Sequence, residues 1–379
     1  MKPIIIVGSG LAGYSLLREL KNRQCQVPRV LITAAGGDSY YKPNLSTALA
    51  QKKSAADLVL ADAAAMGQTL SAEILTHTRV VELDPIHHRL TLDRGGELVY
   101  DKLILAVGSA PIRLPLTGDG AEDCLSVNNL EDYALFQEKL TTAHRVAIIG
   151  PGLIGSEFAN DLLQSGREVV IIGPDPWPIS SLIPQAAGQA VQQAMAEKGA
   201  VWHLGTFNGA IEKTATGIRT VLQNGAKVEA DLIMTAVGVR AETQLASRSG
   251  LKTNRGIVTD LFLQTSAPDI YALGDCAEVG GKNLPFVQPL MIGSRALAST
   301  LLGQPTEVHY PPMPVAIKTH LHPVITLPAQ TKEGHWVFDG QPTTGIVGRF
   351  FDSDARLAGF VLTGNRTSEK AEIMKELPQ

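Results

Sequence analysis

The stretch IIIVGSGLAG, residues 4–13, places four apolar residues directly before three glycines in the spacing G-x-G-x-x-G. The same arrangement returns as VAIIGPGLIG at residues 146–155. A helical pattern follows each stretch, so each predicts a buried strand, a tight turn and a helix, the phosphate-binding element of a dinucleotide-binding fold. A single match is weak evidence because glycine loops are common. Two matches in this context indicate two dinucleotide sites in one chain, and a protein with two such sites is expected to pass electrons between them.

The three glycines of each loop have different predicted roles. The first allows the strand-to-helix turn, the second lets a pyrophosphate approach the backbone, and the third lets the helix pack close to the strand. In that order the pairs are Gly8 and Gly150, Gly10 and Gly152, and Gly13 and Gly155. The diphosphate is then expected on free N–H groups at the positive end of the helix. Pro151 has no N–H, so the second loop offers one donor fewer.

Length and composition limit the class of protein. The chain has 379 residues, enough for two or three domains, with 44% hydrophobic and 18% charged residues, as in an ordinary globular protein. No apolar stretch reaches the roughly 18 residues that span a bilayer, and the first strand begins too early for a signal peptide. We therefore expect a cytoplasmic protein without membrane insertion. The net charge of −4 and the lack of a basic stripe argue against a nucleic-acid partner.

The three cysteines, Cys25, Cys124 and Cys276, are far apart in the sequence. They form no C-x-x-C or C-x4-C pair, so the sequence predicts neither a redox disulfide nor a metal site. Free thiols fit a reducing cytoplasm. Cys276 follows a Gly-Asp pair that suggests a functional site, but a small buried packing residue is the favoured interpretation.

The two glycine loops begin two similar halves. Each half continues through a helix, a second strand, antiparallel strands and a closing apolar strand, which ends at Gly108 in the first half and Gly238 in the second. This order predicts an α/β fold with two Rossmann-like domains and a small C-terminal α+β domain. Each Rossmann-like domain is expected to have three layers, in the order ββα. The expected boundaries are 1–111 together with 245–314, then 112–244, then 315–379.

Several residues outside the loops point to ligand chemistry. Lys42 follows the second strand, and Glu157 lies in the first turn of the second unit's helix. The two side chains are candidates for a buried pair between the cofactors, although both are equally well explained as solvated residues. Asp275 ends an apolar stretch over 265–273 that predicts a strand, and its carboxylate would accept hydrogen bonds from a polyol chain. A plain helix cap is the alternative. Pro289 is expected as the first residue of a helix directed at the ligand.

The second strand of each half bears on which nucleotide binds. No Arg or Lys stands between Gly173 and Ser181 to hold a 2′-phosphate, which favours NADH over NADPH. The acidic residue usual at this strand end is also missing, with Asp175 displaced from it. In the first half, Thr33 and Ala34 stand where an acidic residue would grip the adenosine ribose.

These features together resemble the FAD-dependent pyridine-nucleotide oxidoreductases of the glutathione-reductase fold. The likeness covers nearly the whole chain and, within that family, is greatest to the branch that reduces rubredoxin, with flavorubredoxin reductases as near relatives. It rests on the segments GSGLAGYSLLREL, SYYKPNLST, ILTHTRV, GLIGSEFANDL, NRGIVTD, IYALGDCAEV and MPVAIKT.

The resemblance assigns roles to individual residues. It implies tightly but non-covalently bound FAD in the first domain (1–111 and 245–314), NADH in the second, and an interface role for the third. Lys42 and Glu157 would be the catalytic pair at the flavin. The implied FAD contacts are Gly8, Ser9, Gly10, Leu11, Ala12, Gly13, Thr33, Ala34, Lys42, Val80, Asp275, Val287 and Lys318. On the NADH side they are Gly150, Gly152, Leu153, Ile154, Gly155 and Glu157.

The missing cysteine pair separates this chain from the disulfide-reducing members of that family. The flavin itself would have to deliver electrons to the acceptor. The resemblance implies that this acceptor is a rubredoxin, in a chain serving alkane degradation or oxygen detoxification. A ferredoxin reductase of an oxygenase system, a flavorubredoxin reductase and an NADH-sensing flavoprotein acting through a partner stay open as alternatives. So does the choice between monomer and homodimer.

Overall fold

The computed structural model describes residues 1–378, and the chain divides into two compact units. Unit 1 comprises residues 1–42, 56–110 and 239–311. Unit 2 comprises residues 43–55, 111–238 and the chain from residue 312 onward. The short segment 43–55 therefore packs with residues that come much later in the sequence.

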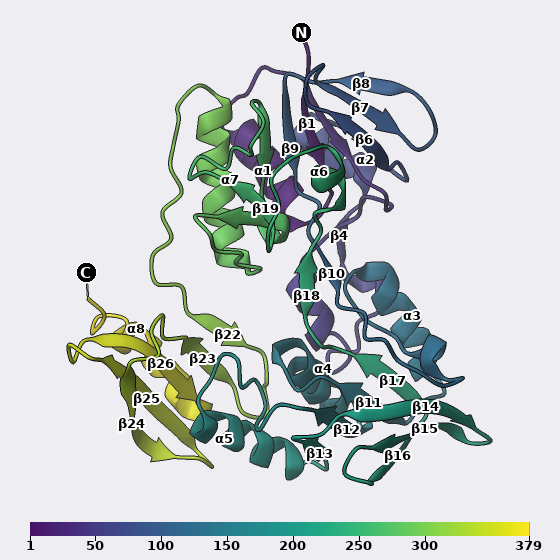
Figure 1. Ribbon diagram of the computed structural model, residues 1–379, viewed down its shortest axis with the longest axis vertical. Coiled ribbons are helices and arrows are strands. Elements are labelled where there is room, and N and C mark those ends of the chain that lie inside the picture. The colour runs from purple at the N-terminus through teal and green to yellow at the C-terminus, as the bar shows by residue number, and fades with distance from the viewer. Residues whose placement is uncertain (379) are drawn as a thin grey trace. The chain divides into compact units, whose positions relative to one another are not determined.

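Unit 1 is built on a parallel five-stranded sheet with β1 at its centre (Figure 1). Its strands, in spatial order, are β20 (Ile270–Ala272), β9 (Lys102–Leu105), β1 (Ile4–Val7), β2 (Arg29–Ile32) and β5 (Glu73–Leu75). All four residues of β1 are buried. A central parallel strand is covered on both faces, which explains why it is a continuous apolar run without alternation.

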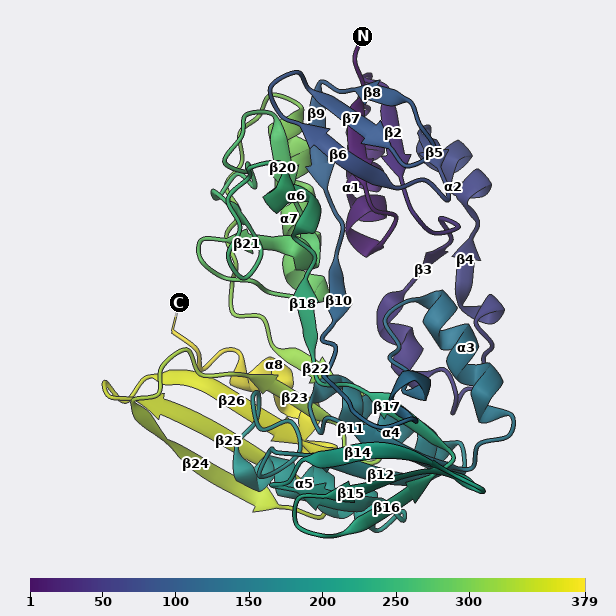
Figure 2. The same ribbon diagram turned by 45° about the vertical axis from the view of Figure 1, so that its right-hand side comes forward.

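One face of this sheet carries helices and the other an antiparallel meander (Figures 1 and 2). Helices α1 (Leu11–Asn22) and α7 (Val287–Leu301) lie side by side, and the Ser15 hydroxyl lies 3.4 Å from the Met291 sulfur. The meander consists of β6 (Val80–Asp84), β7 (Arg89–Leu92) and β8 (Glu97–Val99). The remaining elements are β3 (Ser39–Tyr40), β4 (Val59–Ala61), α2 (Ala63–Leu70), β10 (Ser109–Pro111), β18 (Val239–Ala241), α6 (Gln244–Arg248), β19 (Ile257–Thr259) and β21 (Ala277–Val279).

The strand predicted over residues 265–273 is shorter than expected. Only Ile270–Ala272 is a strand, and the chain turns back before it. The Thr265 N–H donates to the Ile270 carbonyl at 2.8 Å, while Asp269 has a left-handed φ of 62°. The Thr265 hydroxyl also bonds the backbone of Ala267. These local hydrogen bonds compete with the sheet ladder, so the prediction was wrong for residues 265–269.

Unit 2 repeats the sheet order of unit 1. Its parallel strands are β13 (Val201–Leu204), β12 (Glu168–Gly173), β11 (Arg145–Ile149) and β17 (Leu232–Thr235). The lead-in to the closing strand is also shared, since the Asp101 N–H donates to the Pro3 carbonyl and that of Asp231 to the Arg145 carbonyl. The predicted α/β fold with a repeated nucleotide-binding unit is confirmed.

A meander, three longer helices and a second sheet complete unit 2. The meander covers one face of the parallel sheet with β14 (Asn208–Thr214), β15 (Gly217–Leu222) and β16 (Lys227–Ala230) (Figure 2). The helices are α3 (Leu130–Leu140), α4 (Leu153–Gln164) and α5 (Gln185–Ala196). The antiparallel C-terminal sheet has the order β22 (Val315–Ile317), β23 (Val324–Leu327), β26 (Leu357–Thr363), β25 (Gly345–Asp352) and β24 (Gly334–Gln341), followed by α8 (Lys370–Ile373).

Within unit 2 the C-terminal sheet packs against α5, and the Thr326 hydroxyl bonds the Leu182 carbonyl at 3.3 Å. No helix among residues 1–378 is both long and apolar enough to cross a membrane.

Candidate functional site

The glycine loop of unit 1 has the backbone that a dinucleotide site needs. Gly8 has φ of +118°, and a Cβ there would overlap the Ala106 carbonyl oxygen. A Cβ on Gly13 would overlap the carbonyl oxygen of Gly8, so the helix can approach the strand only without a side chain. A Cβ on Gly10, in contrast, would have nothing within 4 Å. The middle glycine therefore borders open space where a phosphate group fits.

The loop of unit 2 has the same geometry. Gly150 has φ of +115°, and Cβ atoms on Gly150 and Gly155 would clash with backbone, whereas one on Gly152 would meet nothing within 4 Å. Leu153 and Ile154 are the first two residues of α4. The two loops, although far apart in sequence, therefore have the same backbone conformation.

The helix N-termini behind both loops are suited to an anion. The N-cap residues of α1 and α4 are Gly10 and Gly152, which have no side chain to cap the helix. Neither helix has an acidic residue in its first turn, so the prediction of Glu157 in the first turn was wrong: it is the fifth residue of α4. The first N–H groups of such a helix carry partial positive charge and need an acceptor. The residues present therefore fit a diphosphate at each loop.

The residues predicted around the first nucleotide's adenosine lie close together. The Ser9 and Thr33 hydroxyls are 2.8 Å apart, which joins the glycine loop to the end of β2. The Thr78 N–H donates to the Thr33 carbonyl at 2.9 Å, which brings the start of β6, at the buried Val80, beside it. Ala34 is exposed. Their contacts with a ligand stay a prediction.

Asp275 lies beside the first loop. Its carboxylate accepts a hydrogen bond from the Ser109 hydroxyl at 3.0 Å, and its neighbour Gly274 packs against Ala12 in the first turn of α1. Asp275 belongs to a three-residue 3-10 turn and makes no cap hydrogen bond there.

Helix α7 starts earlier than expected. It begins at Val287, so Pro289 is its third residue, and the prediction of Pro289 as the first was wrong. The first turn tolerates proline because its N–H groups have no partner within the helix.

Glu157 has a different cation from the one expected. Its side chain is 1% exposed, and its Oε2 accepts from the Lys318 Nζ at 2.5 Å and from the Ser46 hydroxyl at 2.6 Å. The Lys318 backbone N–H donates to Oε1 at 2.9 Å. Lys42, half-buried at the start of a 3-10 helix, belongs to unit 1, and its pairing with Glu157 stays a prediction.

Two further buried polar residues extend this face of α4 by one turn, and the sequence did not identify either. The Asn160 Oδ1 accepts from the Leu321 N–H at 2.9 Å. The Asp161 carboxylate, 1% exposed, accepts from the Leu49 N–H at 2.9 Å and the Ala50 N–H at 3.0 Å. Their spacing of three and four residues from Glu157, which places all three on the same side of the helix, was the available signal.

Burial raises the pKa of Asp161 to about 6, and the nearby Glu157 raises it too. The two backbone N–H groups and Lys318 act in the opposite direction. Desolvation affects the pKa of Asp161 more than the two backbone hydrogen bonds do, because no cation contacts this carboxylate directly. Glu157, in contrast, is contacted by the Lys318 ammonium.

Helix α3 holds the far end of the segment 43–55. The Tyr133 hydroxyl and the Gln137 amide both donate to the Lys53 carbonyl, at 3.1 and 2.8 Å, and the Ala55 N–H donates to Gln137 at 2.9 Å. Together with α4, this helix fixes the segment at several points within unit 2.

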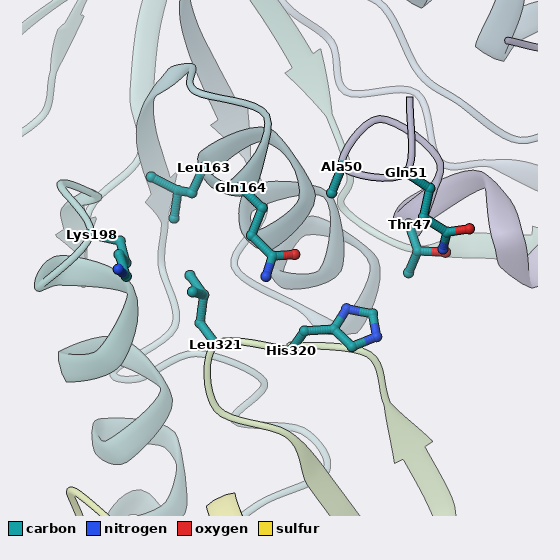
Figure 3. Close-up of a pocket in the computed structure, with 8 residues that line it drawn as sticks. All are labelled: Thr47, Ala50, Gln51, Leu163, Gln164, Lys198, His320 and Leu321. Atoms are coloured by element: carbon teal, nitrogen blue, oxygen red, sulfur yellow. The ribbon is translucent and has the colours of Figure 1, made fainter. Parts of the chain in front are cut away.

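A hollow of about 630 Å³ lies beside this segment (Figure 3). Its lining residues are Thr47, Ala50, Gln51, Leu163, Gln164, Lys198, His320 and Leu321. It borders the C-terminal half of α4, whereas the glycine loop is at the other end of the helix, and no predicted site residue lines it.

The cysteines are unsuited to redox chemistry. All three are free, and Cys276 is fully buried with its thiol 3.2 Å from the Leu105 carbonyl. Burial raises the pKa of Cys276 to about 11 and that of Cys124 to about 11, so neither is a thiolate at neutral pH. The predicted packing role of Cys276 agrees with this burial.

Comparison with known proteins identifies the family. The family model described as "Pyridine nucleotide-disulphide oxidoreductase" matches residues 2–298. The model described as "Rubredoxin binding C-terminal domain" matches residues 307–377. The chain belongs to the pyridine nucleotide-disulphide oxidoreductase family, and the resemblance predicted from its segments is confirmed.

Its relatives within that family match it from end to end. The chain is 41% identical to a rubredoxin-NAD(+) reductase of Alcanivorax borkumensis, with 100% of this chain and 99% of the relative covered. It is 34% identical to a nitric oxide reductase FlRd-NAD(+) reductase of Aliivibrio fischeri, with 99% and 98% covered. A solved ferredoxin reductase of Rhodopseudomonas palustris matches with a TM-score of 0.89 over 98% of this chain and 93% of that chain. At 23% identity this last likeness shows the fold alone.

The different surroundings of two glycines in the second loop give a matched pair of variants. Gly155→Ala is expected to lower the melting temperature, because its Cβ cannot be accommodated against Gly150. Gly152→Ala should fold normally and raise KM for NADH by about tenfold or more, because its methyl group enters the space left for the phosphates. Thermal unfolding and steady-state kinetics measure the two effects, and equal behaviour of the variants would contradict the assigned roles.

The raised pKa of Asp161 predicts how stability depends on pH. The folded carboxylate has its pKa above the unfolded value of 3.8, so its contribution to stability is greatest below pH 4 and is lost as pH rises through about 6. Relative to Asp161→Asn, the wild type should lose up to about 3 kcal/mol between pH 4 and 7. Urea unfolding across this range tests the difference, and parallel curves for the two proteins would contradict it.

Proposed function

We propose that the chain is an FAD-dependent NADH:rubredoxin oxidoreductase acting in the cytoplasm. The observation that carries the proposal is the end-to-end 41% identity to a rubredoxin-NAD(+) reductase, together with the C-terminal match to a rubredoxin-binding domain. Two glycine loops with the same geometry, in one chain, support a role for two dinucleotides.

Each domain would have the binding role that the sequence suggests. Residues 1–111 and 245–314 would bind FAD tightly without a covalent bond, residues 112–244 would bind NADH, and residues 315–379 would meet the acceptor. The chemistry that FAD supplies when bound is acceptance of a hydride from NADH and release of electrons one at a time. The protein's own residues would contribute to the mechanism by binding and orienting the two nucleotides and by placing charge near them.

The first loop would hold the FAD diphosphate on the N-terminal N–H groups of α1, where no side chain competes for them. Asp275, fixed by Ser109, would accept hydrogen bonds from the ribityl chain. The N-terminus of α7 at Val287 would add positive dipole, and Lys42 a cation, against negative charge on the ring.

The second loop and α4 would serve NADH in the same way. One turn beyond the loop, Glu157 binds the Lys318 ammonium through its carboxylate. The hydrogen bonds to Glu157 fix the position of this lysine directly after β22. A held cation of this kind can orient and stabilise charge at the nicotinamide and flavin without itself reacting.

The end of β12 supports a preference for NADH. The Asp175 carboxylate accepts from the Ser180 hydroxyl at 2.5 Å, and no basic residue lies between them. A 2′-phosphate there would meet a carboxylate with no counter-ion.

A flavorubredoxin reductase is the second candidate, because the chain is 34% identical over nearly its whole length to a nitric oxide reductase FlRd-NAD(+) reductase. The two activities differ only in the acceptor. Alkane degradation or oxygen detoxification as the downstream pathway follows from neither relative's name.

The acceptor assay tests the proposal. Purified holoenzyme with NADH is expected to reduce rubredoxin at least about tenfold faster than ferredoxin, and faster with NADH than with NADPH. The rate of NADH oxidation with each iron protein is the measurement, with free FAD as the background control. Rubredoxin reduction at the background rate would overturn the proposal, and faster reduction of a flavorubredoxin would favour the second candidate.

The cysteines give an independent test of the electron path. A variant with Cys25→Ser, Cys124→Ser and Cys276→Ala is expected to keep kcat within about twofold, because no thiol takes part. Anaerobic titration of the wild type with NADH should bleach the flavin without a long-wavelength thiolate charge-transfer band. Such a band, or loss of turnover in a variant that folds and binds FAD, would contradict the path.

A further inference from the structure

Three of the buried polar residues of α4, Glu157, Asn160 and Asp161, lie on one side of the helix, and only Glu157 contacts a cation. Glu157 is neutralised by Lys318, and Asn160 is uncharged. Asp161 is fully buried and accepts only from two backbone N–H groups. An ionised carboxylate in that position costs stability, so its presence calls for an explanation other than packing.

A continuous chain of contacts leads from Asp161 to the Glu157–Lys318 pair. Asp161 binds the backbone of residues 49 and 50, immediately after the 3-10 helix that carries Ser46. The Ser46 hydroxyl, itself buried, donates to Glu157 at 2.6 Å. The same Glu157 oxygen binds the Lys318 ammonium. The position of the segment 46–50 therefore determines whether Ser46 reaches Glu157.

We propose that Asp161 is a positioning residue: its ionised carboxylate pins residues 49–50, and so holds Ser46 and the Glu157–Lys318 pair in the arrangement used for electron transfer from NADH. The inference rests on the proposed function. It adds to that function a residue that touches neither substrate nor cofactor and acts through Ser46.

Protonation would release this arrangement. Protonation turns one of the two carboxylate oxygens into a hydroxyl, which is a weaker acceptor, so the hydrogen bond from the Leu49 or the Ala50 N–H is weakened. The charged and titratable groups that face Asp161 are Glu157 on its own helix, Lys318 after β22 and Tyr133 on α3. With the pKa of Asp161 raised to about 6, the release falls just below neutral pH.

The structure leaves space for the released segment to move. The hollow of Figure 3 is lined on one side by Thr47, Ala50 and Gln51, the residues that flank the pinned backbone. On its other sides lie the end of α4 and residues 320–321. A shift of the segment into this hollow requires no rearrangement of the sheet.

The first test is the pH dependence of turnover with a small acceptor. FAD-loaded wild type with NADH and ferricyanide should show kcat halved near pH 6 and falling toward tenfold per pH unit below it. Asp161→Asn should lower kcat at pH 8 by about tenfold and lose this acid limb, with KM for NADH nearly unchanged. A purely structural role would lower the melting temperature and leave the acid limb in the remaining activity.

Two further variants test whether the effect of Asp161 on turnover passes through Ser46. If Asp161 acts through Ser46, the double variant Asp161→Asn/Ser46→Ala should be no slower than the slower single variant. Tyr133→Phe is the matched control, because it removes another anchor of the same segment while Gln137 still binds Lys53. It should keep kcat within about twofold and retain the acid limb. Multiplicative effects in the double variant, or an acid limb that persists in Asp161→Asn, would overturn the proposal.

Hydrogen exchange provides a readout that does not depend on activity. At pH 7.5, peptides covering residues 43–50 of FAD-loaded Asp161→Asn should exchange about tenfold faster than in the wild type, while β11 peptides are unchanged. Unchanged exchange over 43–50 would overturn the proposal. If ferricyanide is reduced but rubredoxin is not, only the proposed acceptor fails. If NADH reduces neither, the proposed function fails, and the exchange result alone decides whether Asp161 pins the segment.

Discussion

The buried polar face of α4 is the interaction on which the rest of unit 2 depends. Glu157, Asn160 and Asp161 occupy one side of a single helix, and each binds backbone from a distant part of the chain. One partner segment is 43–55, and the other is residues 318–321 at the start of the C-terminal sheet. Without this face, the N–H groups of Leu49, Ala50, Lys318 and Leu321 would lose their acceptors, and a folded protein rarely leaves buried N–H groups unpaired.

The two carboxylates on this face are stabilised in the protein interior by different groups. Glu157 gains an ammonium and a hydroxyl within hydrogen-bond distance, so its charge is compensated where it lies. Asp161 gains only amide dipoles, and its pKa rises to about 6 as a result. Asp161 is therefore the carboxylate on this face whose protonation is expected to change just below neutral pH.

The sequence predicted the elements that depend on residues close together in the chain, and it missed contacts between residues that are far apart in the chain. The glycine loops, the helices behind them and the repeated order of elements along the chain were predictable, because each depends on patterns within a short stretch of sequence. The start of α7 was misplaced because a proline fits any position in the first turn. The embedding of 43–55 in unit 2 was not predictable, since the contacts of Ser46, Leu49 and Ala50 join residues more than a hundred positions apart. The Lys318 partner of Glu157 was missed for the same reason.

The helices behind the two glycine loops differ in the residues that follow each loop. Helix α1 corresponds to α4 residue by residue after the glycine loop, and the positions of Glu157, Asn160 and Asp161 are occupied by Ser15, Arg18 and Glu19. In unit 1 that face packs against α7, with Ser15 beside the Met291 sulfur, and Arg18 is exposed. The two loops have the same backbone geometry, which the proposed diphosphate sites would both require. The two helices differ beyond their loops: at the fifth helical position, α4 has the acidic residue Glu157 where α1 has the uncharged Ser15.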